Sequence, residues 1–461
     1  MIDLSDLLQP DRGQPARLVE VIAPDNWADW LVKQPPRARA TLAAHGLTGK
    51  PGNKVILPGD GPDDWSALLV CDEPVSSPWR FASMSAFLPA GTYRLADGVT
   101  GAGALGWLLG QHRFERYRKP AEGGARVLLT PDAARLAETV RLAEATALVR
   151  DLVNTPASDC GPAELEAATD SLAKAHGATM TVTRGDALAS GYPMIHAVGQ
   201  AASKDRHPRL IELEWGDPSH PGVAIVGKGV TFDTGGLDIK PSAGMRLMKK
   251  DMGGAAHALA LASLVMAARL PVRLHLLIPA VENSIGSNAF RPGDVLRTRA
   301  GLTVENTNTD AEGRLILGDA LTKAGEGKPE LILDFATLTG AARVALGPDL
   351  PPLFSNDDAL ANALLAAGTA LHDPLWRLPL WDGYDDGLKS DIADLQNAPE
   401  GGMAGAITAA LFLRRFVPAG VAWAHMDVFA WRPAAKAGRP KGGDAFGVRA
   451  AYQVLKERYS R

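Results

Sequence analysis

Residues 227–240 read Gly-Lys-Gly-Val-Thr-Phe-Asp-Thr-Gly-Gly-Leu-Asp-Ile-Lys, a glycine-rich loop with two lysines and two aspartates. The loop directly follows an apolar run, Val223 to Val226, that predicts a buried strand. Similar runs lie at 210–215, 274–281, 331–335 and 421–428, and helical stretches such as Ala255 to Ala268 separate several of them. This alternation indicates an α/β fold with a mainly parallel sheet. Because ligands of such sheets bind at the carboxyl ends of strands, the residues just after each run are the candidates for chemistry.

Two further segments have the same character. Residues 248–255, Met-Lys-Lys-Asp-Met-Gly-Gly-Ala, place Asp251 just before a helix of small residues. Residues 308–315, Asn-Thr-Asp-Ala-Glu-Gly-Arg-Leu, place Asp310 and Glu312 two positions apart, so both side chains can project the same way from an extended or turn segment. Each segment alone is more often a turn or a helix cap than a site. Together their carboxylates and cations predict a shared site.

The N-terminal part of the chain predicts a separate, small α/β domain. Short apolar runs at 54–57, 67–71 and 126–129 alternate there with proline- and glycine-rich punctuation. Thr130, Pro131 and Asp132 then supply an N-cap, a proline at the first helical position and an early acid, and they open a long helix that runs to Val153. We therefore predict an N-terminal domain over residues 1–131, followed over 132–461 by a linking helix and a larger, mainly parallel α/β domain.

Composition narrows the possible functions. The 461 residues exceed what one hydrophobic core supports, and 46% hydrophobic with 22% charged residues is typical of a globular protein. A net charge of −4 lacks the basic excess of a nucleic-acid or acidic-lipid binder. Two cysteines, Cys71 and Cys160, exclude a disulfide framework and a cysteine-rich zinc site. The sequence shows no secretory signal and no membrane-length apolar stretch of roughly 18 residues, which predicts a cytoplasmic protein.

The three polar segments resemble the signature of the leucyl aminopeptidase family of dinuclear metallopeptidases. The stretches Asn-Thr-Pro-Ala at 154–157, Ala-Thr-Leu-Thr-Gly at 336–340 and Trp-Ala-His-Met-Asp at 423–427 match in the same order and approximate spacing. The resemblance spans the last two thirds of the chain. It implies an aminopeptidase that removes the first residue of peptides with a free N-terminus, assembled as a homo-hexamer.

The resemblance also implies two divalent metal ions per chain, with zinc or manganese expected first. Five residues match the family's ligands: Lys228, Asp233, Asp251, Asp310 and Glu312. Asp233 and Glu312 match the carboxylates that bridge both ions, Lys228 and Asp251 match ligands of the tighter site, and Asp310 matches the ligand of the more exchangeable one. Four carboxylates balance two dications. An amine coordinates only through its lone pair, so Lys228 must lose its proton, whereas Lys240 keeps its own.

Two further side chains, Lys240 and Arg314, match the family's catalytic residues. The implied nucleophile is a bridging hydroxide, with Lys240 stabilising the oxyanion and the residue matching Arg314 holding a bicarbonate that acts as general base. Residues that match the family's substrate pocket are Met248, Thr337, Leu338 and Gly340. Lys249, Lys250 and Asp238 depart from the family pattern and leave the substrate preference open.

Weaker signals point elsewhere. Gly101 to Gly106 form a GxGxxG that would suit a nicotinamide cofactor, but only Glu122 loosely supplies the expected acid, so we favour a small-residue helix running through Leu109. Some members of the family also bind DNA, yet no lysine- or arginine-rich run supports a nucleic-acid partner here. His257 and His425 lack HExxH spacing and are interpreted as packing residues, not metal ligands.

Overall fold

A computed structural model of the protein describes residues 3–61, 64–119 and 123–460. The chain divides into two compact units. The first comprises Met1–Ala147 and Ala434–Lys441, and the second comprises Leu148–Pro433 and Gly442–Arg461. The predicted long helix, α5 (Ala133–Asn154), contributes residues to both units, so the domain boundary at residue 131 stays a prediction.

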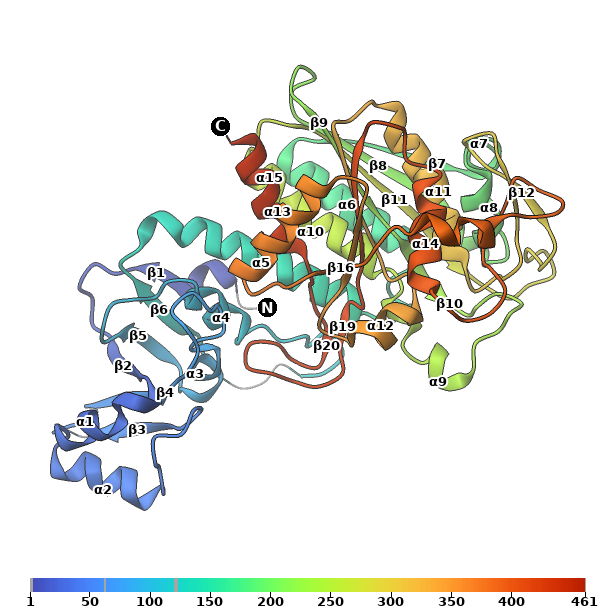
Figure 1. Cartoon of the computed structure of the whole chain (residues 1–461). Helices are drawn as coiled ribbons and strands as arrows, with labels where there is room; N and C mark the ends of the chain where they lie inside the picture. The colour runs from blue at the N-terminus through green and yellow to red at the C-terminus, as the bar shows by residue number, and fades with distance from the viewer. Residues whose placement is uncertain (1–2, 62–63, 120–122, 461) are drawn as a thin grey trace. The chain divides into compact units, whose positions relative to one another are not determined.

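The first unit is built on a six-stranded sheet in the order β1-β6-β5-β2-β4-β3 (Figure 1). Neighbouring strands are parallel except β3 and β4, which pair antiparallel at one edge. The strands are β1 (Leu8–Pro10), β2 (Arg17–Ile22), β3 (Lys54–Pro58), β4 (Trp65–Val70), β5 (Gly91–Leu95) and β6 (Arg126–Thr130). The helices of this unit are η1 (Leu4–Leu7), η2 (Pro24–Asn26), α1 (Trp27–Val32), α2 (Pro36–Ala44), α3 (Ala82–Phe87) and α4 (Gly103–Leu109). The prediction of a small α/β domain is confirmed.

The GxGxxG motif forms the start of α4 and belongs to the core of this unit. Every residue of α4 is buried, and the Trp107 indole Nε1 donates a hydrogen bond to Arg126 O over 2.8 Å. The small residues therefore allow close packing, in agreement with the prediction that this motif starts a helix. Glu122, the acid considered for a nucleotide site, lies outside the described residues.

Helix α5 begins two residues later than predicted. Thr130 is the last residue of β6 and pairs with Pro10 of β1, so its backbone is extended and held in the sheet. Asp132 takes the capping position instead, because its Oδ1 accepts a hydrogen bond from Arg135 N (3.3 Å). Thr130 Oγ1 still accepts a hydrogen bond from Asp132 N (3.1 Å), so both residues bond the backbone at the start of the helix.

The second unit contains a nine-stranded sheet that is mainly parallel at its centre. The order is β16-β15-β18-β14-β9-β11-β8-β7, with β10 pairing β11 off this path. Strands β18, β14, β9 and β11 are parallel, and antiparallel pairs occur toward the two edges. The strands are β7 (Thr179–Arg184), β8 (Arg209–Trp215), β9 (Gly222–Gly227), β10 (Gly229–Asp233), β11 (Arg273–Asn283), β14 (Leu331–Ala336), β15 (Pro352–Ser355), β16 (Trp376–Arg377) and β18 (Ala422–Asp427). The predicted fold class is confirmed.

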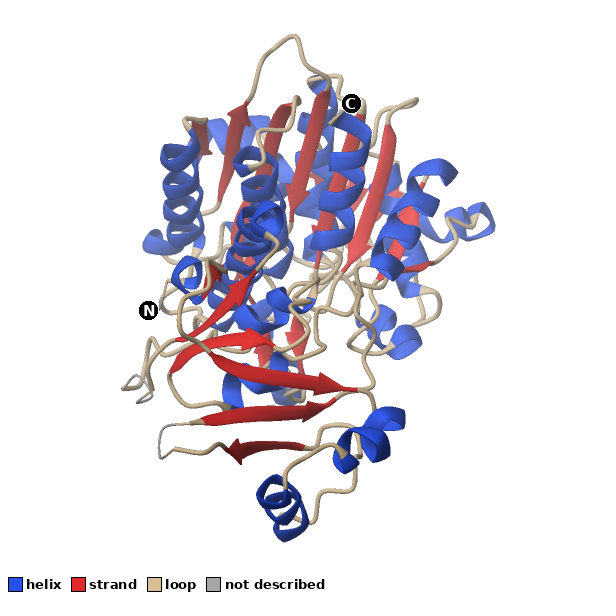
Figure 2. Ribbon diagram, turned by 90° about the vertical axis from the view of Figure 1, so that its left-hand side faces the viewer, coloured by secondary structure: helices blue, strands red, loops and turns tan. Residues whose placement is uncertain are grey.

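Helices cover this sheet on both faces (Figure 2). Strands β9 and β14 are buried at every residue, because α10 packs on them from one side and α11 from the other. One core cluster joins α8, α11 and α14 to these central strands. The helices are α6 (Pro162–His176), α7 (Gly185–Gly191), α8 (Pro193–Gly199), η3 (Lys204–Arg206), α9 (Ser242–Met245), η4 (Met248–Lys250), α10 (Gly253–Ala267), α11 (Glu312–Glu326), α12 (Gly340–Leu346), α13 (Asp358–Ala370), η5 (Asp382–Leu388), α14 (Gly405–Arg414) and α15 (Val448–Tyr459).

Two small strand groups complete the second unit. A three-stranded sheet has the order β12 (Val295–Arg297), β13 (Thr303–Glu305) and β17 (Leu395–Gln396), and β19 (Trp431–Arg432) pairs with β20 (Gly442–Gly443). None of the helices among the described residues is long and apolar enough to cross a membrane.

The start of α10 approaches the central strands so closely that only glycine fits. A Cβ built at Gly254 would lie 2.2 Å from Phe335 O and 2.8 Å from Lys228 N. Both are backbone atoms of segments packed in the sheet, so neither can yield without moving a strand. This approach places the residues before α10 beside the carboxyl ends of β9 and β14.

We expect Gly254→Ala to lower the free energy of unfolding by about 1–3 kcal/mol, because the added methyl group forces these strands apart. Urea-induced unfolding followed by circular dichroism measures the change. Gly244→Ala is the matched control, since a Cβ there would meet no atom closer than 4.0 Å. Equal midpoints for the two variants would contradict the close approach.

Candidate metal centre and substrate pocket

The predicted ligands gather at the carboxyl ends of the central strands, in the second unit. Lys228 directly follows β9, and Asp233 is the last residue of β10. Asp251 precedes α10, and Glu312 is the first residue of α11, which starts immediately after the turn that contains Asp310. Parallel strands end at the same edge of a sheet, and this is why segments about eighty residues apart meet here.

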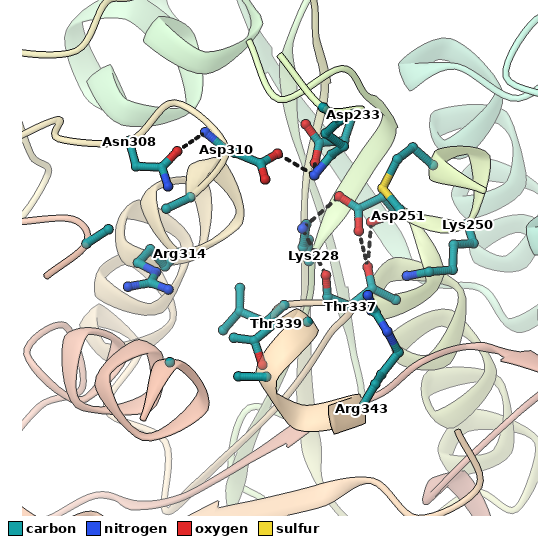
Figure 3. A pocket seen from close by; sticks show the side chains of 18 residues that line it. Lys228, Asp233, Lys250, Asp251, Asn308, Asp310, Arg314, Thr337, Thr339 and Arg343 are labelled. Carbon is teal, nitrogen blue, oxygen red and sulfur yellow. Dashed lines mark hydrogen bonds and ion pairs between the residues drawn. The ribbon is translucent and has the colours of Figure 1, made fainter. Parts of the chain in front are cut away.

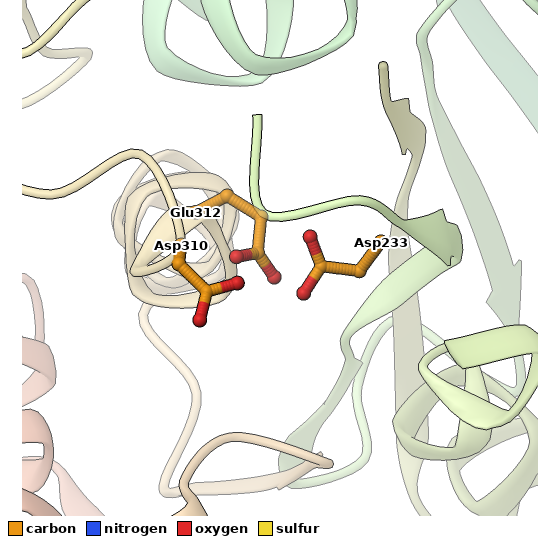
Figure 4. Close-up of side chains that lie close together, drawn as sticks. All are labelled: Asp233, Asp310 and Glu312. Atoms are coloured by element: carbon orange, nitrogen blue, oxygen red, sulfur yellow. The ribbon is translucent and has the colours of Figure 1, made fainter. Parts of the chain in front are cut away.

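Three carboxylates lie close enough to share one ion. Asp233, Asp310 and Glu312 each offer an oxygen, and these oxygens lie within 4.8 Å of one another (Figure 4). Asp233 and Glu312 are 2% and 1% exposed, whereas the Asp310 side chain is 35% exposed. In the part of the chain that the structure describes, no second group of His, Cys, Asp or Glu has this geometry.

Two lysines of the glycine-rich loop divide the carboxylates between them. The Lys228 ammonium lies 2.7 Å from Asp251 Oδ2 and 2.9 Å from Glu312 Oε1, and it donates to Thr337 O over 3.0 Å. Lys240 Nζ lies 2.8 Å from Asp233 Oδ2 and also contacts Asp310 Oδ1. Lys228 is buried and Lys240 is 15% exposed at its side chain, so the two amines face different surroundings.

Glycine at position 313 makes room for the Lys228 side chain. A Cβ there would lie 2.7 Å from both Lys228 Cε and Nζ. The Lys228 amine therefore passes directly against the first turn of α11 and reaches Glu312 from the strand side.

A second layer of polar residues orients the carboxylates. Asn283, the buried last residue of β11, donates to Asp233 Oδ1 (2.8 Å) and to Thr309 O (3.1 Å). Asp238 Oδ2 accepts from Thr309 N (2.7 Å), and this bond ties the glycine-rich loop to the turn that contains Asp310. Asp238 is not among the residues that line the pocket described below.

The cluster contains more negative than positive charge. Four carboxylates contact only two ammonium groups, and Glu312 Oε2 has no hydrogen-bond partner although it is buried. Burial, reinforced by the charge of Asp233, raises the pKa of Glu312 to about 8 and that of Asp310 to about 6. Burial opposes the charge of Lys228, but the surrounding carboxylates outweigh it and raise the lysine's pKa above its usual value. Additional positive charge would stabilise this arrangement.

A pocket of about 230 Å³ opens beside the cluster, and all four predicted pocket residues line it (Figure 3). They are Met248, Thr337, Leu338 and Gly340. Lys228, Asp233, Lys240, Asp251, Asp310 and Arg314 also contribute to its walls. The structure therefore brings the predicted site residues together, with Glu312 behind them at the start of α11.

Arg314 is buried and only partly bonded. Its Nη1 donates to Asn397 O (2.6 Å), whereas its Nε has no hydrogen-bond partner. Burial lowers the pKa of the guanidinium to about 10, which leaves it charged at neutral pH. A charged donor with a free N–H on a pocket wall suits a small planar anion.

Sequence reasoning missed three residues that shape this site: Asn283, Asn397 and Asp427. Asp427 ends β18 and accepts from Leu338 N (2.9 Å) and Thr339 Oγ1 (2.7 Å), which positions the loop after β14. Asn283 and Asp427 are polar residues at strand ends, so the rule applied to residues 227–240 could have found them. Asn397 lies far from any predicted strand end, and no local signal marks it.

One end of the pocket carries two cations that were not assigned a role. Lys250 and Arg343 both line the pocket, and both lie against the Phe429 ring, at 5.1 Å and 4.7 Å from its centroid. Figure 3 shows the two side chains approaching Thr337 from different sides. Burial, together with the charges of Arg343 and Lys228, lowers the pKa of Lys250 to about 8.

The two histidines serve packing and hydrogen bonding, as predicted. His257 Nε2 accepts from Phe446 N (3.0 Å), so its Nδ1 donates to Gly253 O (2.6 Å). His425 Nδ1 bonds Asp334 Oδ1 (2.5 Å) inside the sheet. Neither belongs to the carboxylate group described above.

Comparison with known proteins gives consistent matches along the whole chain. A family profile described as "Cytosol aminopeptidase family, catalytic domain" matches residues 147–452, and one described as "M17 aminopeptidase, N-terminal domain" matches residues 18–130. A probable cytosol aminopeptidase of Roseiflexus castenholzii is 38% identical over 98% of this chain and 95% of its own length.

Solved structures agree with these matches. The crystal structure of cytosol aminopeptidase from Coxiella burnetii has a TM-score of 0.94 and 46% identity, covering 98% of this chain and 100% of that one. The bottromycin maturation enzyme BotP, in complex with Mn, has a TM-score of 0.86 and 35% identity, covering 96% of this chain and 100% of that one.

Proposed function

Because the chain belongs to the cytosol aminopeptidase family and is therefore an aminopeptidase acting on peptides, we propose that it hydrolyses the bond after the N-terminal residue with the help of two divalent metal ions. The ligands of these ions would be Lys228, Asp233, Asp251, Asp310 and Glu312. The family is the one that the three polar segments predicted. One observation carries the proposal: Asp233, Asp310 and Glu312 converge within 4.8 Å, and Glu312 Oε2 is buried without a partner.

The residues present fit a pair of dications. The cluster has more carboxylates than ammonium groups, and oxygen-rich ligands with one amine are compatible with zinc and manganese. BotP, of similar structure, is described in complex with Mn. Lys228 would join the ligands only as a neutral amine, so metal binding there must displace its proton.

Bound metal ions supply Lewis-acid activation of water and of the scissile carbonyl, and a site for the free α-amine. The chain's own residues do the rest. Burial opposes the charge of Lys240, but Asp233, Glu312 and Asp310 outweigh it and raise the pKa, so the side chain stays an ammonium. From the pocket wall it can donate to the developing oxyanion. The unpartnered Nε of Arg314 supports the proposal that this residue holds a bicarbonate, which would accept the proton of the attacking water.

A free α-amine should be essential in the substrate. We expect leucine amide to be hydrolysed and N-acetyl-leucine amide to be inert, since acetylation removes the lone pair and adds bulk at the amine subsite. Release of ammonia measures both reactions on one enzyme preparation. Equal rates for the two compounds would indicate an endopeptidase or amidase instead.

The proposal extends to a hexamer in the cytoplasm, as the resemblance implies. The curated relatives are named cytosol aminopeptidases, which supports this location. Light scattering of the purified protein measures the assembly, and a mass other than six chains would contradict it.

A further inference from the structure

We propose that the pocket for the first side chain accepts an acidic residue, so that the enzyme prefers peptides beginning with glutamate or aspartate. This inference rests on the proposed function, because it assigns a substrate class to the same site. The residues that carry it are Lys250, Arg343 and Phe429.

Arg343 and Lys250 both line the same pocket as Met248, Thr337, Leu338 and Gly340, the residues assigned to the substrate's first side chain. A Cβ built at Gly340 would lie 3.6 Å from Arg343 Nη2, so the guanidinium folds back beside Gly340. Lys250 is 1% exposed and lines the same wall as Met248 and Thr337. The charged heads of both side chains, Lys250 Nζ and Arg343 Cζ, lie over the Phe429 ring and therefore close to one another.

Neither cation has a carboxylate partner among the described residues. Two acids lie near them, but both are occupied elsewhere. Asp251 Oδ2 contacts Lys228 and its Oδ1 accepts from Thr337, whereas Asp427 accepts from the loop that begins at Leu338. Two cations against one ring, without a counter-ion on a pocket wall, form a site for an anionic group.

The chemistry of that group follows from the pocket. A carboxylate can accept from the planar guanidinium and from the ammonium at once, while the methylene groups of glutamate would pack against Phe429 and Met248. A leucine side chain in the same place would leave both cations desolvated and unpaired. The pocket thus discriminates by charge as well as by size.

The test compares the α-amides of glutamate, glutamine and leucine. All three release ammonia and lack a free α-carboxylate, so the glutamate side chain carries the only carboxylate in the set. Glutamate and glutamine differ in charge but hardly in shape. We expect kcat/KM for the glutamate compound to exceed that for glutamine by about 10- to 100-fold, the range that a charge-assisted hydrogen bond provides.

Variants assign the preference to its residues. In Arg343→Met and in Lys250→Met, kcat/KM for the glutamate compound divided by that for the glutamine compound should each fall by about tenfold. Arg343→Lys should retain part of this preference. Arg343→Glu should reverse the selection and raise lysine amide above methionine amide. Lys249→Met is the matched control, because Lys249 donates to Asn154 O and lies outside the pocket, so its ratio should equal that of the wild type.

The outcomes separate this inference from the proposed function. Hydrolysis of none of the amides would refute the proposed function itself. Hydrolysis of leucine amide with a glutamate-to-glutamine ratio of one or less overturns the acidic pocket while the aminopeptidase stands. A glutamate-to-glutamine ratio near one also overturns it if the enzyme prefers Leu-Ala to Leu-Ala amide and Arg343→Met removes that preference. In that case the two cations would bind the terminal carboxylate of a dipeptide.

Discussion

Glu312→Ala should abolish hydrolysis of leucine amide and, in the same preparation, the binding of two metal ions per chain. The side chain is proposed as a ligand of both ions, and its buried Oε2 has no hydrogen-bond partner in the protein. Activity should fall by at least about 10³-fold, since Lewis-acid and nucleophile activation are lost together. Elemental analysis and turnover are measured on the same sample.

Two further variants show that such a loss comes from the site and not from misfolding. Glu312→Gln keeps the volume of the side chain and should also be inactive. Its metal-free form should unfold at a temperature no lower than that of the wild type, because burial and the charge of Asp233 raise the pKa of Glu312 to about 8 and so favour the uncharged carboxyl, which the amide resembles. Glu326→Ala, at the exposed end of the same helix, should keep both metals and activity. Two metals and near-normal turnover in Glu312→Ala would show that the assigned ligands are wrong.

Lys240→Ala and Lys228→Ala should fail in different ways. Lys240→Ala should retain both metal ions and lose about 10²–10³ in turnover, the usual cost of removing one donor to an oxyanion. Lys228→Ala should lose the tighter metal ion, and excess metal should restore part of the rate. Turnover and metal content are again measured on the same preparations.

Each lysine offers a conservative control. Lys240→Arg keeps the positive charge but changes the reach of the donor, so we expect only partial activity. Lys228→Arg cannot coordinate, because a guanidinium keeps its proton, and it should behave like Lys228→Ala. If Lys240→Ala lost metal while Lys228→Ala kept it, the two roles would have to be exchanged.

The acidic residues and lysines of the candidate site could be predicted from sequence because each lies in a short segment whose local pattern of apolar and polar residues predicts where a strand ends or a helix begins. Lys228 directly follows an apolar strand and Asp251 precedes a helix, so a strand end and a helix start marked them in advance. Glu312 was expected in an extended or turn segment, whereas it is the first residue of α11. The α/β class followed in the same way from alternating runs. Helix α5 itself begins at Ala133, two residues later than predicted, although Thr130 Oγ1 accepts a hydrogen bond from Asp132 N.

Tertiary structure alone decided which residues surround these segments. Arg343 lies almost a hundred residues after Lys250, and nothing in either local sequence indicates that both lie against Phe429. The same holds for Asn397, whose carbonyl accepts from Arg314. Periodicity reports which face of an element is buried, but it contains no information on which distant chain covers it. The segments that meet at the strand ends could therefore be predicted from sequence, whereas the proposed charge of the substrate pocket depends on contacts that only the folded chain creates.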